Sequence, residues 1–245
     1  MAYGAAAVHA ILYDWPYLGL AAAAAGLAAL LLAPRTTAEP RWSDPSWLLC
    51  LMLPIYMLHQ FEEHGINLRG EHYHFLAEMC AMLGRPDLAT CPADAPFVLA
   101  VNCGGGVWIP GLLAIFFRRR NPMVGACAMG IALVNAVAHI GQAVARGSYN
   151  SGLATATLLF LPMCAWTLWR LRCSGLLGPR QLASIIGSGV LLHAVLIASV
   201  LGRSRGLWGE GALVAINVAD GLIPLLLGAR AQAGAARSPA AATEC

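Results

Sequence analysis

The sequence predicts an all-α protein, a polytopic membrane helix bundle with about seven transmembrane helices. Composition is the first reason: of 245 residues, 59% are apolar and 11% are charged, and the mean hydropathy is +0.67. A soluble globule of this size carries far more charge, so a soluble enzyme is excluded. The second reason is that apolar runs of about 20 residues, long enough to cross a bilayer as helices, recur along the whole chain. The third is that prolines, glycines and arginines separate these runs.

The runs define seven spans of one domain. In chain order they are residues 17–33, 46–64, 95–117, 122–145, 151–170, 182–201 and 207–227. Pro34, Pro40 and Pro45 separate the first two spans, and three arginines at 118–120, followed by Asn-Pro, separate the third from the fourth. Residues 175–179, which begin with glycine and end with proline, separate the fifth from the sixth. We expect a single transmembrane bundle over residues 1–230 and a disordered tail over residues 231–245.

The arginines predict the orientation. All 15 basic residues are arginine, and with seven spans they divide ten against five between the two ends. The larger set is Arg35, Arg41, Arg118, Arg119, Arg120, Arg170, Arg172, Arg180, Arg230 and Arg237, and the smaller set is Arg69, Arg85, Arg146, Arg203 and Arg205. Basic residues accumulate on the cytoplasmic side, so we expect a bacterial inner-membrane protein with its N-terminus outside and its C-terminus inside. No arginine cluster is interleaved with aromatic residues, so the expected surroundings are the lipid bilayer and no nucleic acid.

Residues 65–94 form the one long polar connection. Within it, residues 71–79 have the apolar and polar spacing of a short helix that lies in the membrane interface and could act as a lid. Cys80 and Cys91 also lie in this connection, and they could form a disulfide if it faces an oxidising compartment. The sequence leaves that pairing open.

Polar residues in the predicted spans share a depth, toward the outer side of the membrane. They are His59, Glu62, Glu63, Asn102, Asn135, His139, Gln142 and His193, with Asn217 and Asp220 near the middle of the seventh span. Burying ionisable groups in hydrocarbon costs several kcal/mol each unless they find partners. We therefore expect side chains from different helices to meet inside the bundle and form a site.

Two of these helices carry polar stripes. His59, Glu62 and Glu63 are spaced i, i+3 and i+4, which places one imidazole and two carboxylates within one arc of a helix. Asn135, His139, Gln142 and Arg146 follow spacings of 4, 3 and 4, which again define one face. The structural alternatives are an interfacial cap for the first stripe and an interhelical hydrogen bond for the second.

Imidazole and carboxylate groups on neighbouring helices are what bundles use to bind iron, manganese or zinc. The same groups could work without a metal, because two adjacent carboxylates at low dielectric resist joint ionisation and one becomes a general acid. His139 or His59 would then be the base. A third reading, a small proton-coupled transporter, uses the same carboxylates as a proton relay, but no inverted repeat is visible.

The residues His59-Gln60-Phe61-Glu62-Glu63 resemble the motif of a bacterial membrane protein family named for His-x-x-Glu-Glu, a family of unsettled function. The second stripe and the stretch that follows it, Arg146 to Gly152, resemble the family's downstream Asn and His and its Tyr-Pro-Gly turn, here with Tyr149. The turn departs from that pattern, because Asn150-Ser151 stands where proline is expected. The resemblance covers residues 46–200 and implies a family without implying a reaction.

Together these observations predict a membrane enzyme, metal-dependent, that acts on a lipophilic small molecule by hydrolysis or oxidation. The alternatives are a metal-free isomerase or cyclase acting on a terpenoid, sterol-like or quinone substrate, and the transporter. The expected metal ligands are His59, Glu62, Glu63, His139 and His193, and the expected catalytic groups are Glu62, Glu63 and His139. The residues expected to orient ligands or substrate are Asn102, Asn135, Gln142, Arg146, Tyr149 and Asp220.

Overall fold

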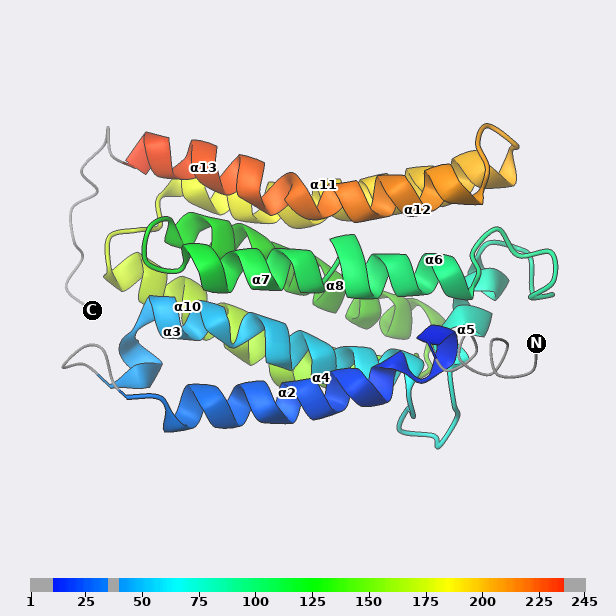
Figure 1. Cartoon of the computed structure of the whole chain (residues 1–245), viewed down its shortest axis with the longest axis horizontal. Coiled ribbons are helices and arrows are strands. Elements are labelled where there is room, and N and C mark those ends of the chain that lie inside the picture. Colours follow the sequence, from blue (N-terminus) through cyan, green and yellow to red (C-terminus); the bar gives the residue numbers. More distant parts are fainter. Residues whose placement is uncertain (1–10, 35–39, 236–245) are drawn as a thin grey trace.

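The computed structural model describes residues 11–34 and 40–235, which form an elongated bundle whose helices run roughly along one axis (Figure 1). No β-strand occurs in these two ranges; the single β-bridge joins Ile66 and His72. The predicted all-α fold class is therefore confirmed.

The first two predicted spans pack against each other as α2 and the pair α3 and α4. Their bounds are α2 Trp15–Leu32, α3 Pro45–Cys50 and α4 Met52–His64, with a single 3-10 turn η1 at Arg41–Ser43. The Asp44 side chain accepts a hydrogen bond from the Ser46 backbone N–H and so caps α3. The second span is interrupted at Leu51. Pro54 has no N–H to donate to the Cys50 carbonyl, which accounts for a break at this point.

The polar connection contains α5, His74–Met82, which corresponds to the expected interfacial helix. Cys80 of α5 is joined to Cys91 by a disulfide, which ties α5 to the segment that leads into the third span. That span comprises α6 Ala95–Ala100, the π-helical turn η2 Val101–Gly105 and α7 Trp108–Phe117. Gly104 has non-helical backbone angles (φ −115°, ψ −113°), so this span is kinked at the glycine.

The remaining spans follow the predicted order. The fourth is α8 Pro122–Arg146, the fifth joins α9 Leu153–Thr155, the π-helical turn η3 Ala156–Phe160 and α10 Leu161–Cys173, and the sixth is α11 Pro179–Ser204. The seventh joins α12 Glu210–Ala219, the 3-10 turn η4 Asp220–Leu222 and α13 Ile223–Ala235. The predicted tail over 231–245 thus begins inside α13, and residues 236–245 lie outside the described residues.

Six helices, in the described part of the chain, are long and apolar enough to cross a membrane. The expected seventh, residues 46–64, is helical along most of its length but is split at Leu51 into two helices that are each too short to count. Figure 1 shows α2 beginning at the end of the bundle where α5 lies and α13 ending at the opposite end, as an odd number of passes requires.

Helix α8 is the centre of the bundle. In its most apolar stretch 67% of residues are buried, against 22% for α2 at the periphery. Its closest neighbour is α11, and glycines let the two backbones approach: a Cβ on Gly189 would collide with the Gly130 carbonyl oxygen, and one on Gly130 would collide with that of Ile185. The central position of α8 places His139, near its C-terminal end, inside the bundle.

Candidate metal centre

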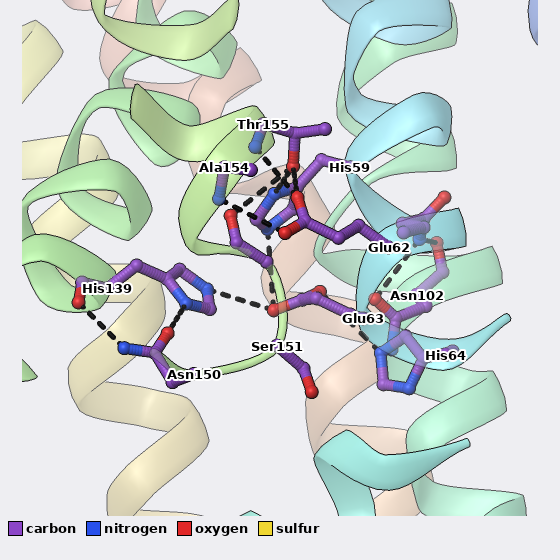
Figure 2. Close-up of polar contacts among 12 residues, drawn as sticks. His59, Glu62, Glu63, His64, Asn102, His139, Asn150, Ser151, Ala154 and Thr155 are labelled. Carbon is purple, nitrogen blue, oxygen red and sulfur yellow. Dashed lines mark hydrogen bonds and ion pairs between the residues drawn. The ribbon is translucent and has the colours of Figure 1, made fainter. Parts of the chain in front are cut away.

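The site lies at the α5 end of the bundle, where α4, α8 and the start of α9 meet (Figures 1 and 2). His59 and Glu63 project from consecutive turns of α4, and His139 projects from α8. All three are buried, with exposed fractions of 0%, 4% and 6%. The predicted meeting of polar residues from different helices therefore occurs for these three.

Both histidines approach the same carboxylate oxygen. His139 Nε2 lies 3.0 Å from Glu63 Oε1, and His59 Nε2 lies 3.3 Å from that atom. One nitrogen or oxygen from each residue lies within 4.8 Å of the others, a spacing that fits shared coordination of a metal ion. Among the described residues this is the one cluster of three or more histidine, cysteine or acidic side chains with such a spacing. His59, Glu63 and His139 are called the group from here on.

A hydrogen bond that His139 donates to Asn150 fixes the tautomer of His139. The Asn150 side-chain N–H donates to the His139 backbone carbonyl at 3.0 Å, which turns its Oδ1 toward His139 Nδ1 at 2.6 Å. An amide oxygen only accepts, so Nδ1 of His139 carries the hydrogen. Nε2, the nitrogen that faces Glu63, is left with its lone pair.

The tautomer of His59 is fixed in the same way by Thr155. The Thr155 hydroxyl donates to Glu62 Oε2 at 2.5 Å, so its one hydrogen is used and its oxygen accepts from His59 Nδ1 at 2.8 Å. Nδ1 of His59 therefore also carries the hydrogen. Its Nε2 is buried with no hydrogen-bond partner, and it too faces Glu63.

Glu62 lies beside the group of His59, Glu63 and His139 and is not one of its members. Its Oε1 accepts from the Ala154 backbone N–H at 3.1 Å and from the Tyr149 hydroxyl at 2.7 Å, and its Oε2 accepts from the Thr155 backbone N–H at 2.7 Å. With the Thr155 hydroxyl, four donors thus surround this carboxylate, and Figure 2 shows those from Ala154 and Thr155. Glu62 therefore positions Thr155, which in turn orients His59.

Tyr149, on the loop between α8 and α9, completes this support. Partial burial, aided by the neighbouring Glu62 carboxylate, raises the pKa of Tyr149 above its ordinary value. Its hydroxyl therefore keeps its proton and donates it to Glu62. The Arg69 guanidinium lies 5.2 Å from the centre of the Tyr149 ring, a cation–π contact that holds the ring in place.

Gly152 lets the loop pass directly over the group. Its φ of +96° lies in the left-handed region that favours glycine. A Cβ here would lie 2.8 Å from Cε1 of both His59 and His139 and 2.9 Å from Glu63 Cγ. Any larger residue at position 152 would collide with all three members of the group.

The arrangement leaves three electron-pair donors pointing at one another. Two imidazole Nε2 atoms and one carboxylate oxygen converge. A neutral imidazole carries one N–H, and in both histidines it is at Nδ1, where it donates to Thr155 or Asn150. Each Nε2 therefore has no hydrogen. Lone pairs buried together repel unless a cation lies between them. The group could therefore hold a metal ion or take up extra protons.

Three further predicted residues lie together beside the group. A cavity of about 80 Å³ adjoins Glu63, and Asn102 of η2, Asn135 of α8 and His193 of α11 line it. Its wall is otherwise mostly apolar and includes Phe75 and Met79 of α5, so the expected interfacial helix forms part of that wall. His193 Nδ1 lies 2.8 Å from the Gly189 carbonyl oxygen in its own helix, so His193 stands at the cavity and outside the three-residue group.

Other predicted residues lie elsewhere. Gln142 donates to Met82 Sδ of α5, and Arg146 is exposed at the end of α8. Asp220 belongs to η4, where its Oδ1 lies against Gly105 of η2 and has no hydrogen-bond partner. None of these three lines the cavity at Glu63.

The sequence interpretation missed Thr155 and the role of Asn150. Both act from the segment after α8, which hydropathy alone assigns to a loop and to the start of a span. The available signal was the departure of Asn150-Ser151 from the expected proline, because an asparagine side chain can hydrogen-bond a histidine and proline cannot. Nothing in the sequence near Thr155 indicates its contact with His59, 96 residues earlier.

Comparison with known proteins agrees with the position of this group. Residues 50–167 match the model of a protein family described as "Protein of unknown function with HXXEE motif", so the resemblance carried by His59, Glu62 and Glu63 is confirmed. The matched segment includes the group and both residues that hold its histidines, whereas His193 and Asp220 lie outside it. No curated protein and no solved structure matches the chain.

Proposed function

Since residues 50–167 of this protein match the model of the HXXEE-motif family, whose function is unknown, we propose from the site itself that the chain is an integral membrane metalloenzyme. His59, Glu63 and His139 bind one divalent ion, and the enzyme acts on a lipophilic small molecule by hydrolysis or oxidation. The observation that carries the proposal is the convergence of two Nε2 lone pairs on Glu63 Oε1, each held in place through its own Nδ1.

The donor set narrows the metal to iron, manganese or zinc. Two imidazoles and one carboxylate form the ligand set of catalytic zinc sites with an open fourth position, and also of non-haem iron sites with several open positions. Hydrogen bonds donated by the Nδ1–H groups of both histidines are the usual support of such ligands. A bound ion of this kind activates water or dioxygen by withdrawing electron density.

The chain's own residues have separate tasks in this proposal. Asn150 and Thr155 hold the imidazoles, and Glu62 holds Thr155. The loop at Gly152 covers one side of the group, and the apolar cavity adjoins Glu63 from another. A cavity of about 80 Å³ accommodates only a small group, so the reacting end of a lipophilic molecule enters there while the rest lies outside it.

Proton transfer without a metal is the second candidate function. It is favoured by the 3.0 Å approach of His139 Nε2 to Glu63 Oε1, because a proton between these atoms satisfies both. In this version Glu63 and His139 exchange a proton with a lipid-like substrate, and activity persists in the presence of a chelator.

The site faces the outer side of the membrane in this proposal. The end that carries the site also carries the Cys80–Cys91 disulfide, which persists in oxidising compartments, and the opposite end carries most of the arginines. A reporter whose signal depends on its compartment, fused after the last helix, tests this orientation. We expect the signal of a cytoplasmic C-terminus. The signal of a C-terminus on the outer side would contradict the proposed orientation.

Metal analysis by mass spectrometry on the detergent-purified full chain tests the proposed function. We expect close to one iron, manganese or zinc ion per wild-type chain, after reconstitution if purification strips it. His139→Ala should weaken binding by roughly a hundredfold or more, because loss of a ligand costs more than the 10–100-fold typical of an outer-shell partner. Two controls, His72→Ala at the exposed surface and His193→Ala at the cavity, should keep the ion.

Each outcome decides between the two candidate functions. An ion that is lost in His139→Ala and retained in both controls supports the metalloenzyme. No stoichiometric ion in a monodisperse, reconstituted wild-type protein contradicts it and leaves proton transfer by Glu63 and His139. An ion that survives His139→Ala places the metal elsewhere and also contradicts the proposal.

A further inference from the structure

A second cavity lies at the opposite end of the bundle and has no part in the proposed metal chemistry. It is an elongated groove of about 480 Å³ between α2, the pair α3 and α4, and α7, and it falls in the size range of specific ligand sites. We propose that this groove, with arginines at its mouth, is a binding site for an acidic phospholipid of the surrounding membrane. The site would place one acyl chain along α2 and the phosphate at the arginines.

The floor of the groove suits a hydrocarbon chain. Small residues of α2 and its C-cap line one side, namely Ala22, Gly26, Ala29 and Ala33, and Leu53, Pro54 and Met57 of α4 line the other. From residue 22 to residue 33 an α-helix rises about 16 Å, which is more than half the thickness of one bilayer's hydrocarbon core. The groove therefore runs along the helix axis, in the direction in which lipid chains lie.

The mouth of the groove carries positive charge. Arg41, Arg118 and Arg119 line it, with Asp44 as the one acidic residue among the lining groups. Arg41 and Arg118 each donate one hydrogen bond to a backbone carbonyl, of Ala33 and Ile115 respectively, which fixes their guanidinium groups at the rim. A guanidinium has five N–H donors, so several remain for a phosphate. None of the ion pairs formed within the described ranges involves these three arginines.

A second apolar surface meets the first at Arg118. It is a shallow depression of about 560 Å³ on the other side of α7, lined by Ile109, Leu112, Leu113 and Phe116, and it shares Ile115 and Arg118 with the groove. Two apolar tracks that converge on one basic residue match a lipid with two chains and one anionic head. This geometry favours an acidic phospholipid over a free phosphate, which would use the arginines and neither track.

Native mass spectrometry of the full-length protein, titrated with phosphatidylglycerol or with phosphatidylcholine, tests this site. We expect one phosphatidylglycerol to bind at least about fivefold more tightly than phosphatidylcholine, because each arginine near an acidic headgroup contributes on the order of a fivefold gain. Arg118→Gln with Arg119→Gln should remove that preference. The matched control, Arg85→Gln with Arg205→Gln, removes the same charge at the other end and should keep it.

A third variant and a soluble competitor complete the test. Ala29→Phe fills the groove and should weaken both lipids while leaving the arginines in place. Equal binding of the two lipids to the wild type, or an unchanged preference in the Arg118 and Arg119 variant, overturns the proposal. Displacement of the lipid by millimolar glycerol phosphate to the same extent as by free phosphatidylglycerol also overturns it, because the site would then recognise a phosphate alone.

Discussion

Gly152→Ala is expected to weaken metal binding by roughly a hundredfold, although every ligand is retained, because both imidazoles are displaced at once. The new Cβ would lie 2.8 Å from Cε1 of both His59 and His139, closer than carbon atoms tolerate. The loop or the two rings must move, and even a small displacement separates the three donor atoms. A competition titration against a chromophoric chelator measures the affinity.

Gly147→Ala is the matched control for this variant. Gly147 ends α8 with a φ of +63°, so alanine pays a similar left-handed backbone penalty of roughly 1–2 kcal/mol there. A Cβ at Gly147 meets nothing within 4 Å. We expect wild-type metal affinity in Gly147→Ala. Equal losses in the two variants would show that backbone strain, and not the contact with the group, weakens the site.

Glu63→Gln is expected to abolish measurable metal binding, whereas Glu62→Gln should weaken it by roughly 10–100-fold. The amide introduced by Glu63→Gln lacks the charge that balances a divalent ion between two neutral imidazoles, and its contact atom can be an N–H that points at the lone pairs. Glu62 accepts four hydrogen bonds and reaches the site only through Thr155, which is the arrangement of an outer-shell partner. The same titration measures both.

The ratio between the two neighbouring substitutions is the informative quantity. Both variants remove one carboxylate from the same turn of α4, so nonspecific effects of charge on the bundle are shared. If Glu62→Gln lost the ion as completely as Glu63→Gln, Glu62 would be a ligand, as the sequence alone predicted. If Glu63→Gln retained the ion with wild-type affinity, the assignment of the group would be wrong.

Hydropathy was enough to predict the fold class and the order of the spans. Runs of apolar residues bounded by proline and arginine reflect the cost of unpaired backbone groups and charges in a bilayer, which is a local property of the sequence. The split at Leu51 could have been anticipated from Pro54, since the missing N–H acts on its own helix. The close approach of α8 and α11 at their glycines could not be predicted. It depends on which helices become neighbours, and hydropathy along the sequence does not give that information.

Part of the candidate site was also predictable, because it depends on local spacing along one helix. The spacing of His59 and Glu63 fixes them on one face of a helix, and shared depth with His139 suggested that the three meet. The different use of Glu62 could not be derived, because its partners belong to α9 and to the loop before it. The holding roles of Asn150 and Thr155 are likewise tertiary contacts. They arise where the chain after α8 folds back over α4.

X-ray absorption spectroscopy at the metal edge of the loaded, full-length protein tests the central claim most directly, because it reports the atoms bound to the ion. The account predicts two imidazole nitrogens, with zinc at about 2.0–2.1 Å, together with oxygen ligands and no sulfur. His139→Ala with residual metal should show the signal of one imidazole. A first shell of oxygen alone, or one that contains thiolate sulfur, would contradict the assignment of His59, Glu63 and His139 as the metal centre.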